Sequence, residues 1–167
     1  IGFNTKLSDS IFKVTIECHK NFGISKSSKL GIAYNGLATN QFHRKKYKKA
    51  DSLYKIAIKK LNDFYGKQQN VNQLICYSNI IELKLNQKKY DQGLDFLEKA
   101  RLTKINCFNK EVTIYDAYLL NLEGDIIKGN KKDKSLSTEK YKQALSIAKN
   151  YFDDNHRFIK KLKNKIE

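Results

Sequence analysis

Side chains suited to catalysis are scattered along this sequence rather than grouped in motifs. The three histidines, His19, His43 and His156, fall in different segments, with no Ser/His/Asp or Cys/His arrangement near them. No phosphate-binding glycine loop, zinc-protease motif or calcium-binding loop occurs. We therefore expect no enzymatic activity and no cofactor in this chain.

The three cysteines, Cys18, Cys76 and Cys107, are odd in number and widely separated. A disulfide framework needs paired cysteines, and a structural zinc site needs a close Cys/His spacing that is absent here. Unpaired cysteine behaves as a small hydrophobic residue. The sequence thus predicts buried free thiols and no metal site.

Positive charge is the other chemical feature, because 33 Lys and Arg residues against 17 Asp and Glu give a formal net charge of +16. A field of this strength favours acidic partners or polyanions. Three short clusters hold many of these cations: Arg44, Lys45, Lys46, Lys48 and Lys49; Lys88 and Lys89; and Lys131, Lys132 and Lys134. Such runs either bind a partner or only cover solvated turns.

An internal repeat supplies the elements that carry these residues. The segment SDSIFKVTIECHKNF at 8–22 matches ADSLYKIAIKKLNDF at 50–64, an offset of 42 residues. The segment 45–61 matches 88–104 at an offset of 43, and 137–150 follows at 44. A fixed period of this size is the signature of a repeat architecture.

Each copy is predicted to be a helix, because the copy at 50–65 has apolar residues at helical spacing. This prediction extends to 8–22, where alternating apolar and polar residues alone would indicate a strand. Further helices are predicted before the later copies, over 27–43, 70–86 and 110–128. Small residues would let the two helices of a repeat approach closely, namely Ala50, Ala57, Gly93, Ala100 and Ala144.

Together these positions resemble the tetratricopeptide repeat, although the period is 42–44 residues instead of about 34. The small residue expected in the first helix is also replaced by Ile81 in one repeat. Longer repeats of this kind are similar to those of kinesin light chains and of bacterial peptide-responsive regulators. The resemblance, over residues 8 to about 150, implies an all-α superhelix of about three and a half helical hairpins.

The predicted organisation is a single repeat domain over residues 1–167, divided at 8–23, 27–66, 69–105 and 109–150. Because the chain begins inside a repeat, we expect it to be a fragment of a longer protein. A capping helix is predicted over 153–166, with an N-cap within 153–155. Its apolar side would be Phe158, Ile159, Leu162 and Ile166, and its exposed side Lys160, Lys161, Lys163 and Lys165. This helix is either a polar cap or a basic contact surface.

In the family resembled, first helices of successive repeats line a concave wall. Mapping the repeat onto this chain places nine residues there: Asn35, Thr39 and His43; Ser78, Glu82 and Asn86; and Tyr118, Asn121 and Asp125. Asn35 and Asn121 are candidates to hold a peptide backbone, because an amide both donates and accepts hydrogen bonds. The alternative is that these residues form an ordinary solvated helix face.

The resemblance implies a non-enzymatic scaffold that binds a protein or peptide partner. Two alternatives stay open: a peptide-sensing domain of a transcription regulator or sensor kinase, and a polyanion-binding protein that uses the lysine clusters as a basic edge. Nucleic acid is not favoured, because few aromatic residues flank the lysines as stacking platforms. No apolar run could span a bilayer and no signal peptide is evident, so we expect a cytoplasmic chain without membrane insertion.

Overall fold

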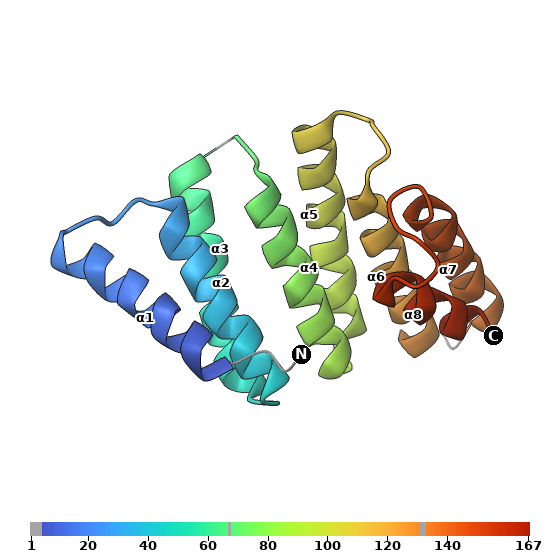
Figure 1. Cartoon of the computed structure of the whole chain (residues 1–167), viewed down its shortest axis with the longest axis horizontal. Coiled ribbons are helices and arrows are strands. Elements are labelled where there is room, and N and C mark those ends of the chain that lie inside the picture. The colour runs from blue at the N-terminus through green and yellow to red at the C-terminus, as the bar shows by residue number, and fades with distance from the viewer. Residues whose placement is uncertain (1–4, 67, 131–132) are drawn as a thin grey trace.

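The computed structural model describes residues 5–66, 68–130 and 133–167, which form eight helices and no strands (Figure 1). The helices are α1 (Thr5–Asn21), α2 (Ser28–His43), α3 (Tyr47–Tyr65), α4 (Val71–Asn86), α5 (Tyr90–Phe108), α6 (Ile114–Asn130), α7 (Lys134–Ala148) and α8 (Arg157–Ile166). Residues 8–21 of the predicted segment 8–22 lie in α1, so this segment is helical as its repeat partner predicted.

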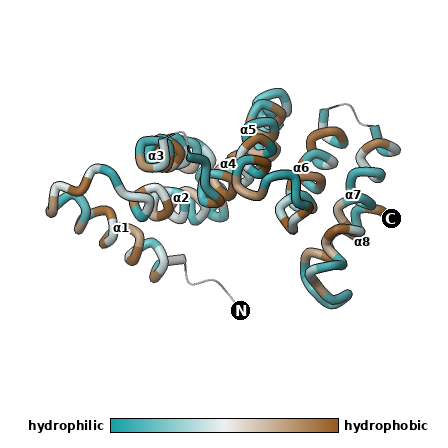
Figure 2. Tube along the Cα trace, turned by 90° about the horizontal axis from the view of Figure 1, so that it is seen from above, coloured by the Kyte–Doolittle hydropathy of each residue, from teal (hydrophilic) through white to brown (hydrophobic). Residues whose placement is uncertain are grey.

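The helices pack as consecutive hairpins, α2 with α3, α4 with α5 and α6 with α7. The first helices α2, α4 and α6 lie next to one another along the molecule (Figure 1). Figure 2 shows α1 and α8 at opposite ends of this row, both on the side of the first helices, so that the stack curves around that face. The chain is thus an all-α superhelix of helical hairpins, as predicted.

The turns inside the first two hairpins have the same backbone shape. Lys45 and Lys88, which are 43 residues apart, both adopt left-handed conformations with φ of 58° and 56°. Residues with a side chain rarely adopt such angles. Since the unusual conformation recurs at one position of the repeat, the repeat extends to the geometry of the turns.

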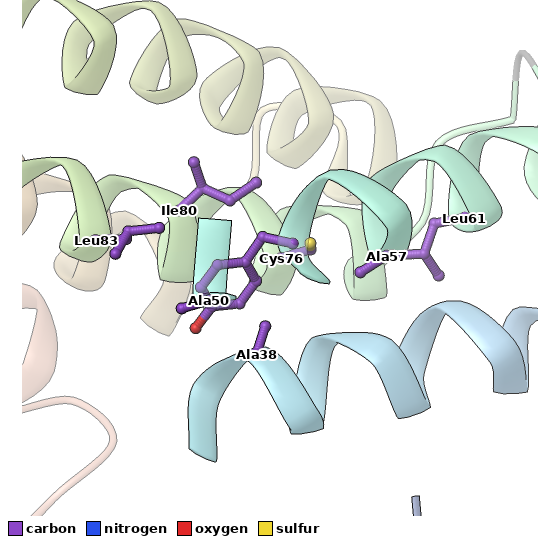
Figure 3. Close-up of a cluster of buried hydrophobic side chains, with 8 residues drawn as sticks. Ala38, Ala50, Ala57, Leu61, Cys76, Ile80 and Leu83 are labelled. Carbon is purple, nitrogen blue, oxygen red and sulfur yellow. The ribbon is translucent and has the colours of Figure 1, made fainter. Parts of the chain in front are cut away.

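Within a hairpin, one residue of the first helix and one of the second have complementary sizes. Gly124 of α6 lies so close to Tyr141 of α7 that a Cβ atom on the glycine would be 2.4 Å from the ring. At the same position of the first hairpin, Ala38 and Tyr54 share a buried cluster. Figure 3 shows Ala38 on α2 pointing toward this cluster. A tyrosine on one helix therefore requires a small residue on the other.

The middle hairpin reverses these sizes. Ile81 stands 43 residues from both Ala38 and Gly124, and Leu97 takes the tyrosine position. Ile81 and Leu97 are both buried in one cluster. Leu97 on α5 is smaller than the tyrosine of the other hairpins, and Ile81 on α4 is larger than their alanine or glycine. The two changes in side-chain volume compensate each other, as close packing in a protein interior requires. The departure of Ile81 from the small-residue pattern is therefore a compensated exchange.

This pairing predicts that substitutions at the two positions depend on each other. Leu97→Tyr should lower the free energy of unfolding by about 1–3 kcal/mol through overpacking, and Ile81→Ala should lower it by ~2–5 kcal/mol through a cavity. The double variant should recover most of both losses, measured by urea denaturation. Losses that simply add would contradict the size complementarity.

Ion pairs join each hairpin to the helix before it. Two of the cations are almost fully buried, since the side chains of Lys84 and Lys104 are each 7% exposed. The junctions α1–α2, α3–α4 and α5–α6 carry Asp9–Arg44 at 2.5 Å, Asp51–Lys84 at 2.5 Å and Asp116–Lys104 at 2.8 Å. Burial raises the pKa of Asp51, but hydrogen bonds from Lys84 and Lys55 lower that pKa more, so it lies below its ordinary value.

We expect Asp51→Asn to lower the free energy of unfolding by ~2 kcal/mol at pH 7, because it leaves the Lys84 ammonium buried without its anion. Asp63→Asn on the same helix is the control, since its partner Lys59 is 75% exposed and the loss should stay below about 1 kcal/mol. Because the pKa of Asp51 is lower in the folded state than its ordinary value of 3.8, ionised Asp51 stabilises the fold at pH values above 3.8. This stabilisation is lost as the pH falls through the lowered pKa. Denaturation at pH 7 and pH 2 should therefore show the Asp51 effect shrinking in acid; an equal effect at both pH values would contradict the ion pair.

The start of the C-terminal helix differs from its prediction. α8 begins at Arg157, and the Nδ1 atom of His156 accepts its capping hydrogen bond from the Phe158 amide at 3.3 Å. Asp153 instead closes a turn by accepting from the Asn155 amide at 2.8 Å. The predicted cap within 153–155 is therefore wrong, because those residues form a separate turn before the helix.

The cysteines also differ among themselves. Cys76 is fully buried in the cluster of Figure 3, and burial raises the pKa of its thiol to about 12. Cys107 is half-buried, and Cys18 is exposed on α1. The prediction of buried thiols is therefore wrong for Cys18, because the side of α1 that carries Cys18 faces solvent.

Candidate functional site

A groove lies between α4, α6 and α8 on the side of the first helices, and we call it the α4–α6–α8 groove. Its main cavity has a volume of about 370 Å³, within the range typical of ligand sites. A second hollow of about 380 Å³ shares Glu82 and Lys161 with the first. The main cavity is lined by Ile75, Ser78, Asn79, Glu82, Tyr115, Tyr118, Asn121, Leu122, Phe158 and Lys161, and the second adds Leu85, Asn86 and Asp125.

Helix α8 forms one wall of this groove because its apolar side is buried. Phe158, Ile159 and Leu162 are buried in a cluster with residues of α6 and α7. The ring of Phe158 lies 4.5 Å from that of Tyr118, centroid to centroid. Burial raises the pKa of the Tyr118 hydroxyl. Aromatic side chains of α6 and α8 thus form the apolar floor of the groove.

Lys165 fixes the other end of α8 to α6. Its ammonium lies 2.6 Å from a carboxylate oxygen of Asp125 and donates to the Asn121 amide oxygen at 2.7 Å. Tyr141 of α7 donates to the same carboxylate at 2.8 Å. Burial lowers the pKa of Lys165, and Asp125 opposes this shift. Lys165 was predicted on the exposed side of its helix, and that prediction is wrong because α8 turns this residue toward α6.

A similar bridge joins α2 to α4. The Asn79 side chain donates to the amide oxygen of Asn35 at 3.1 Å and lies 3.5 Å from the Thr39 hydroxyl oxygen. The hydroxyls of Thr39 and Tyr54 share a hydrogen bond of 3.1 Å. Asn79 lies 44 residues after Asn35 and 40 after Thr39. Lys165 has the same two spacings from Asn121 and Asp125. The bridge is therefore part of the repeat.

The junction between α4 and α6 lacks this bridge. Leu122 stands at the bridging position, 44 residues after Ser78 and 40 after Glu82, and cannot donate a hydrogen bond. The tyrosine position of this hairpin is Leu97, whose side chain offers no hydroxyl to Glu82. Ser78 donates within its own helix, to the Leu74 carbonyl at 3.0 Å. Over the ranges that the structure describes, no side chain bonds or ion-pairs with the Glu82 carboxylate.

The structure brings six of the nine predicted partner-binding residues to the groove: Ser78, Glu82, Asn86, Tyr118, Asn121 and Asp125. The other three, Asn35, Thr39 and His43, lie on α2 outside it. The amide oxygens of Asn35 and Asn121, predicted to hold a peptide backbone, already accept hydrogen bonds within the chain. Asn121 is only 3% exposed. Among these six residues and within the described ranges, the Tyr118 hydroxyl and the Glu82 carboxylate have no hydrogen-bond partner, and Glu82 is the charged one of the two.

Sequence mapping missed several lining residues. Ile75, Asn79 and Tyr115 lie within one helical turn of predicted positions, so extending the same helical stripe would have found them. Phe158 and Lys161 carried no such signal. They enter the groove because α8 packs against α7 and contacts α6 through Phe158 and Lys165, and the mapping of first helices did not extend to α8.

The lysine clusters of the first two hairpins lie at one edge of the stack, where α2 turns into α3 and α4 into α5 (Figure 1). Arg44 differs from its neighbours because it pairs with Asp9. Lys131 and Lys132 lie outside the described residues. The exposed members of the predicted basic edge are Lys45, Lys46, Lys48, Lys49, Lys88, Lys89 and Lys134.

Residues 5–66, 68–130 and 133–167 offer neither a metal site nor a membrane span. No group of three or more His, Cys, Asp and Glu side chains in these ranges could hold a metal ion. None of their helices combines the length and apolar character that a bilayer span requires.

No protein-family model matches the sequence, and no curated protein matches it. The crystal structure of BtubC (BKLC) from P. vanneervenii matches the fold with a TM-score of 0.72 at 18% sequence identity. The fold is that of a helical-repeat protein. The match covers 92% of this chain and 61% of that one, so this chain spans less than two thirds of its structural neighbour. At this identity, the likeness to BtubC concerns the fold alone.

The bridge to α6 predicts how α8 is held. Lys165→Met should raise the amide hydrogen-exchange rates of residues 157–166 several-fold, because Asp125 loses its cation and α8 loses its contact with Asn121. Lys163→Met is the matched control, since the partner of Lys163 among the described residues is Asp154, which is 68% exposed. Equal exchange in the two variants, measured by mass spectrometry, would show that Lys165 does not anchor the helix.

Proposed function

We propose that this chain is a non-enzymatic binding scaffold that receives a peptide or protein segment in the α4–α6–α8 groove. The observation that carries the proposal is an apolar hollow with an unpartnered carboxylate on its wall. Ile75 remains 38% exposed at this hollow, beside the rings of Tyr115 and Tyr118. Apolar cavities with few polar groups are typical binding sites, since burying one large apolar side chain contributes ~1.5–3 kcal/mol.

The repeat architecture supports the same proposal. We infer that the hairpins are of the tetratricopeptide type and form one domain, because the small-residue positions Ala50, Ala57, Gly93, Ala100 and Ala144 are all buried at helix contacts. In a helical-repeat stack, the face of the first helices is available to a partner that lies across several repeats. The chain therefore offers a surface for an extended segment rather than an enclosed active site.

A randomised peptide display library selected against the wild-type chain tests this function. Selected peptides should lose at least about tenfold in affinity for Ile75→Glu, because a carboxylate at the cavity mouth opposes entry of an apolar side chain. Ile105→Glu on α5 is the matched control, since Ile105 is 46% exposed and does not line the groove. Binding that falls equally in both variants, or in neither, would move the site elsewhere, and selection of no binder would argue against the scaffold.

A further inference from the structure

We propose that the α4–α6–α8 groove selects a segment that presents a lysine or arginine side chain next to a bulky apolar one, with the cation bound at Glu82. This inference rests on the proposed function and names the chemistry of the occupant. It comes from comparing Glu82 with the two residues that occupy the same repeat position, Thr39 and Asp125.

The chain itself shows which group suits such a position. Between α6 and α8, the Lys165 ammonium inserts between Asn121 and Asp125, with contacts of 2.6–2.8 Å to the Asp125 carboxylate. It also lies 4.9 Å from the centroid of the Tyr141 ring, close enough for a cation–π interaction. An ammonium group is therefore the natural ligand of a carboxylate at this repeat position.

At the α4–α6 junction the carboxylate is present and the cation is missing. Glu82 is half-buried, and no bridging donor or tyrosine hydroxyl reaches it within the described part of the chain. Its charge is close enough to contribute to raising the pKa of Tyr54. A carboxylate at this position can accept a charge-assisted hydrogen bond from a cation, and such bonds are stronger than those between neutral groups. A partner can thus supply what Lys165 supplies between α6 and α8.

The walls next to Glu82 define the rest of the occupant. Ile75, Tyr118 and Phe158 form apolar surface in the same cavity, which suits a bulky apolar side chain and the methylene groups of a lysine. Tyr115 and Tyr118 add aromatic rings to the lining of the same cavity, and such rings can attract a cation. A segment with one apolar anchor and one adjacent cation would therefore satisfy both parts of the groove.

Overall charge limits how basic the occupant can be. The chain has a formal net charge of +16, and Lys161 on α8 lines the same cavity without an ion pair among the described residues. Electrostatic repulsion therefore disfavours a strongly basic partner, although physiological salt weakens this repulsion between charges that are more than about 8 Å apart. A single cation is compatible with this field, because Glu82 attracts it only at short range.

The test uses three synthetic hexapeptides titrated into the ¹⁵N-labelled chain at 150 mM salt. They are acetyl-Gly-Ser-Phe-Lys-Ser-Gly-amide and the same peptide with Gln or with Glu in place of Lys. The Lys peptide should shift NMR signals of α4, α6 and α8 around the groove and bind about tenfold more tightly than the Gln peptide. The Glu peptide should bind most weakly.

Variants assign the preference to one carboxylate. Glu82→Gln should abolish the preference for Lys over Gln, whereas Glu98→Gln, which removes an exposed carboxylate from α5, should preserve it. Lys161→Met should leave the Lys peptide bound as tightly or more tightly. Groove binding without a preference for Lys, a preference for Glu, or an unchanged preference in Glu82→Gln would overturn this inference and leave the scaffold function standing. Absence of any shift in the groove would also overturn it, while the Ile75→Glu comparison decides the scaffold function separately.

Discussion

The structure depends on how closely the two helices of each hairpin approach one another. Gly124 leaves room for the ring of Tyr141, and a Cβ atom on Gly31 would lie 2.5 Å from Leu61 across the first hairpin. Neither helix could bury its apolar stripe alone, so each hairpin is stable only when its partner positions fit in size. The Ala38–Tyr54, Ile81–Leu97 and Gly124–Tyr141 pairs are three solutions of this one constraint.

The same constraint reaches the groove. Where the second helix carries tyrosine, its hydroxyl engages the first helix at Thr39 or Asp125. Where the pair is exchanged for Ile81 and Leu97, the packing is preserved but the hydroxyl is lost, and Glu82 keeps no partner among the described residues. A conservative exchange of volume in the core thus changes the chemistry of the surface that a partner would meet.

Much of this was predictable from sequence, because repeat position determines environment. The all-α class, the hairpins and the burial of Ala57 and Ala100 follow from matching segments, and so does the helical state of 8–22. Sequence comparison also proposed Glu82 and Tyr118 for the face of the first helices, and both line the α4–α6–α8 groove. These predictions succeeded because each depends on local periodicity and on the copy next to it.

Other features depend on contacts that the sequence mapping did not cover. The placement of α8 across α6 decides that Phe158 and Lys161 line the groove and that Lys165 is half-buried. The mapping of first helices stopped at α6, although Lys165 stands one period of 43 residues beyond Leu122. Cys18 likewise depends on which side of α1 is covered, and α1 packs against α2 with the opposite side.

The relation between core packing and the free carboxylate can be tested most directly by a crystal structure of the Ile81→Ala/Leu97→Tyr double variant. We predict that the new tyrosine hydroxyl lies within hydrogen-bond distance of the Glu82 carboxylate, in the arrangement that Tyr141 makes with Asp125. A tyrosine ring displaced from the α4–α5 interface, or a Glu82 side chain that stays without this bond, would contradict the relation.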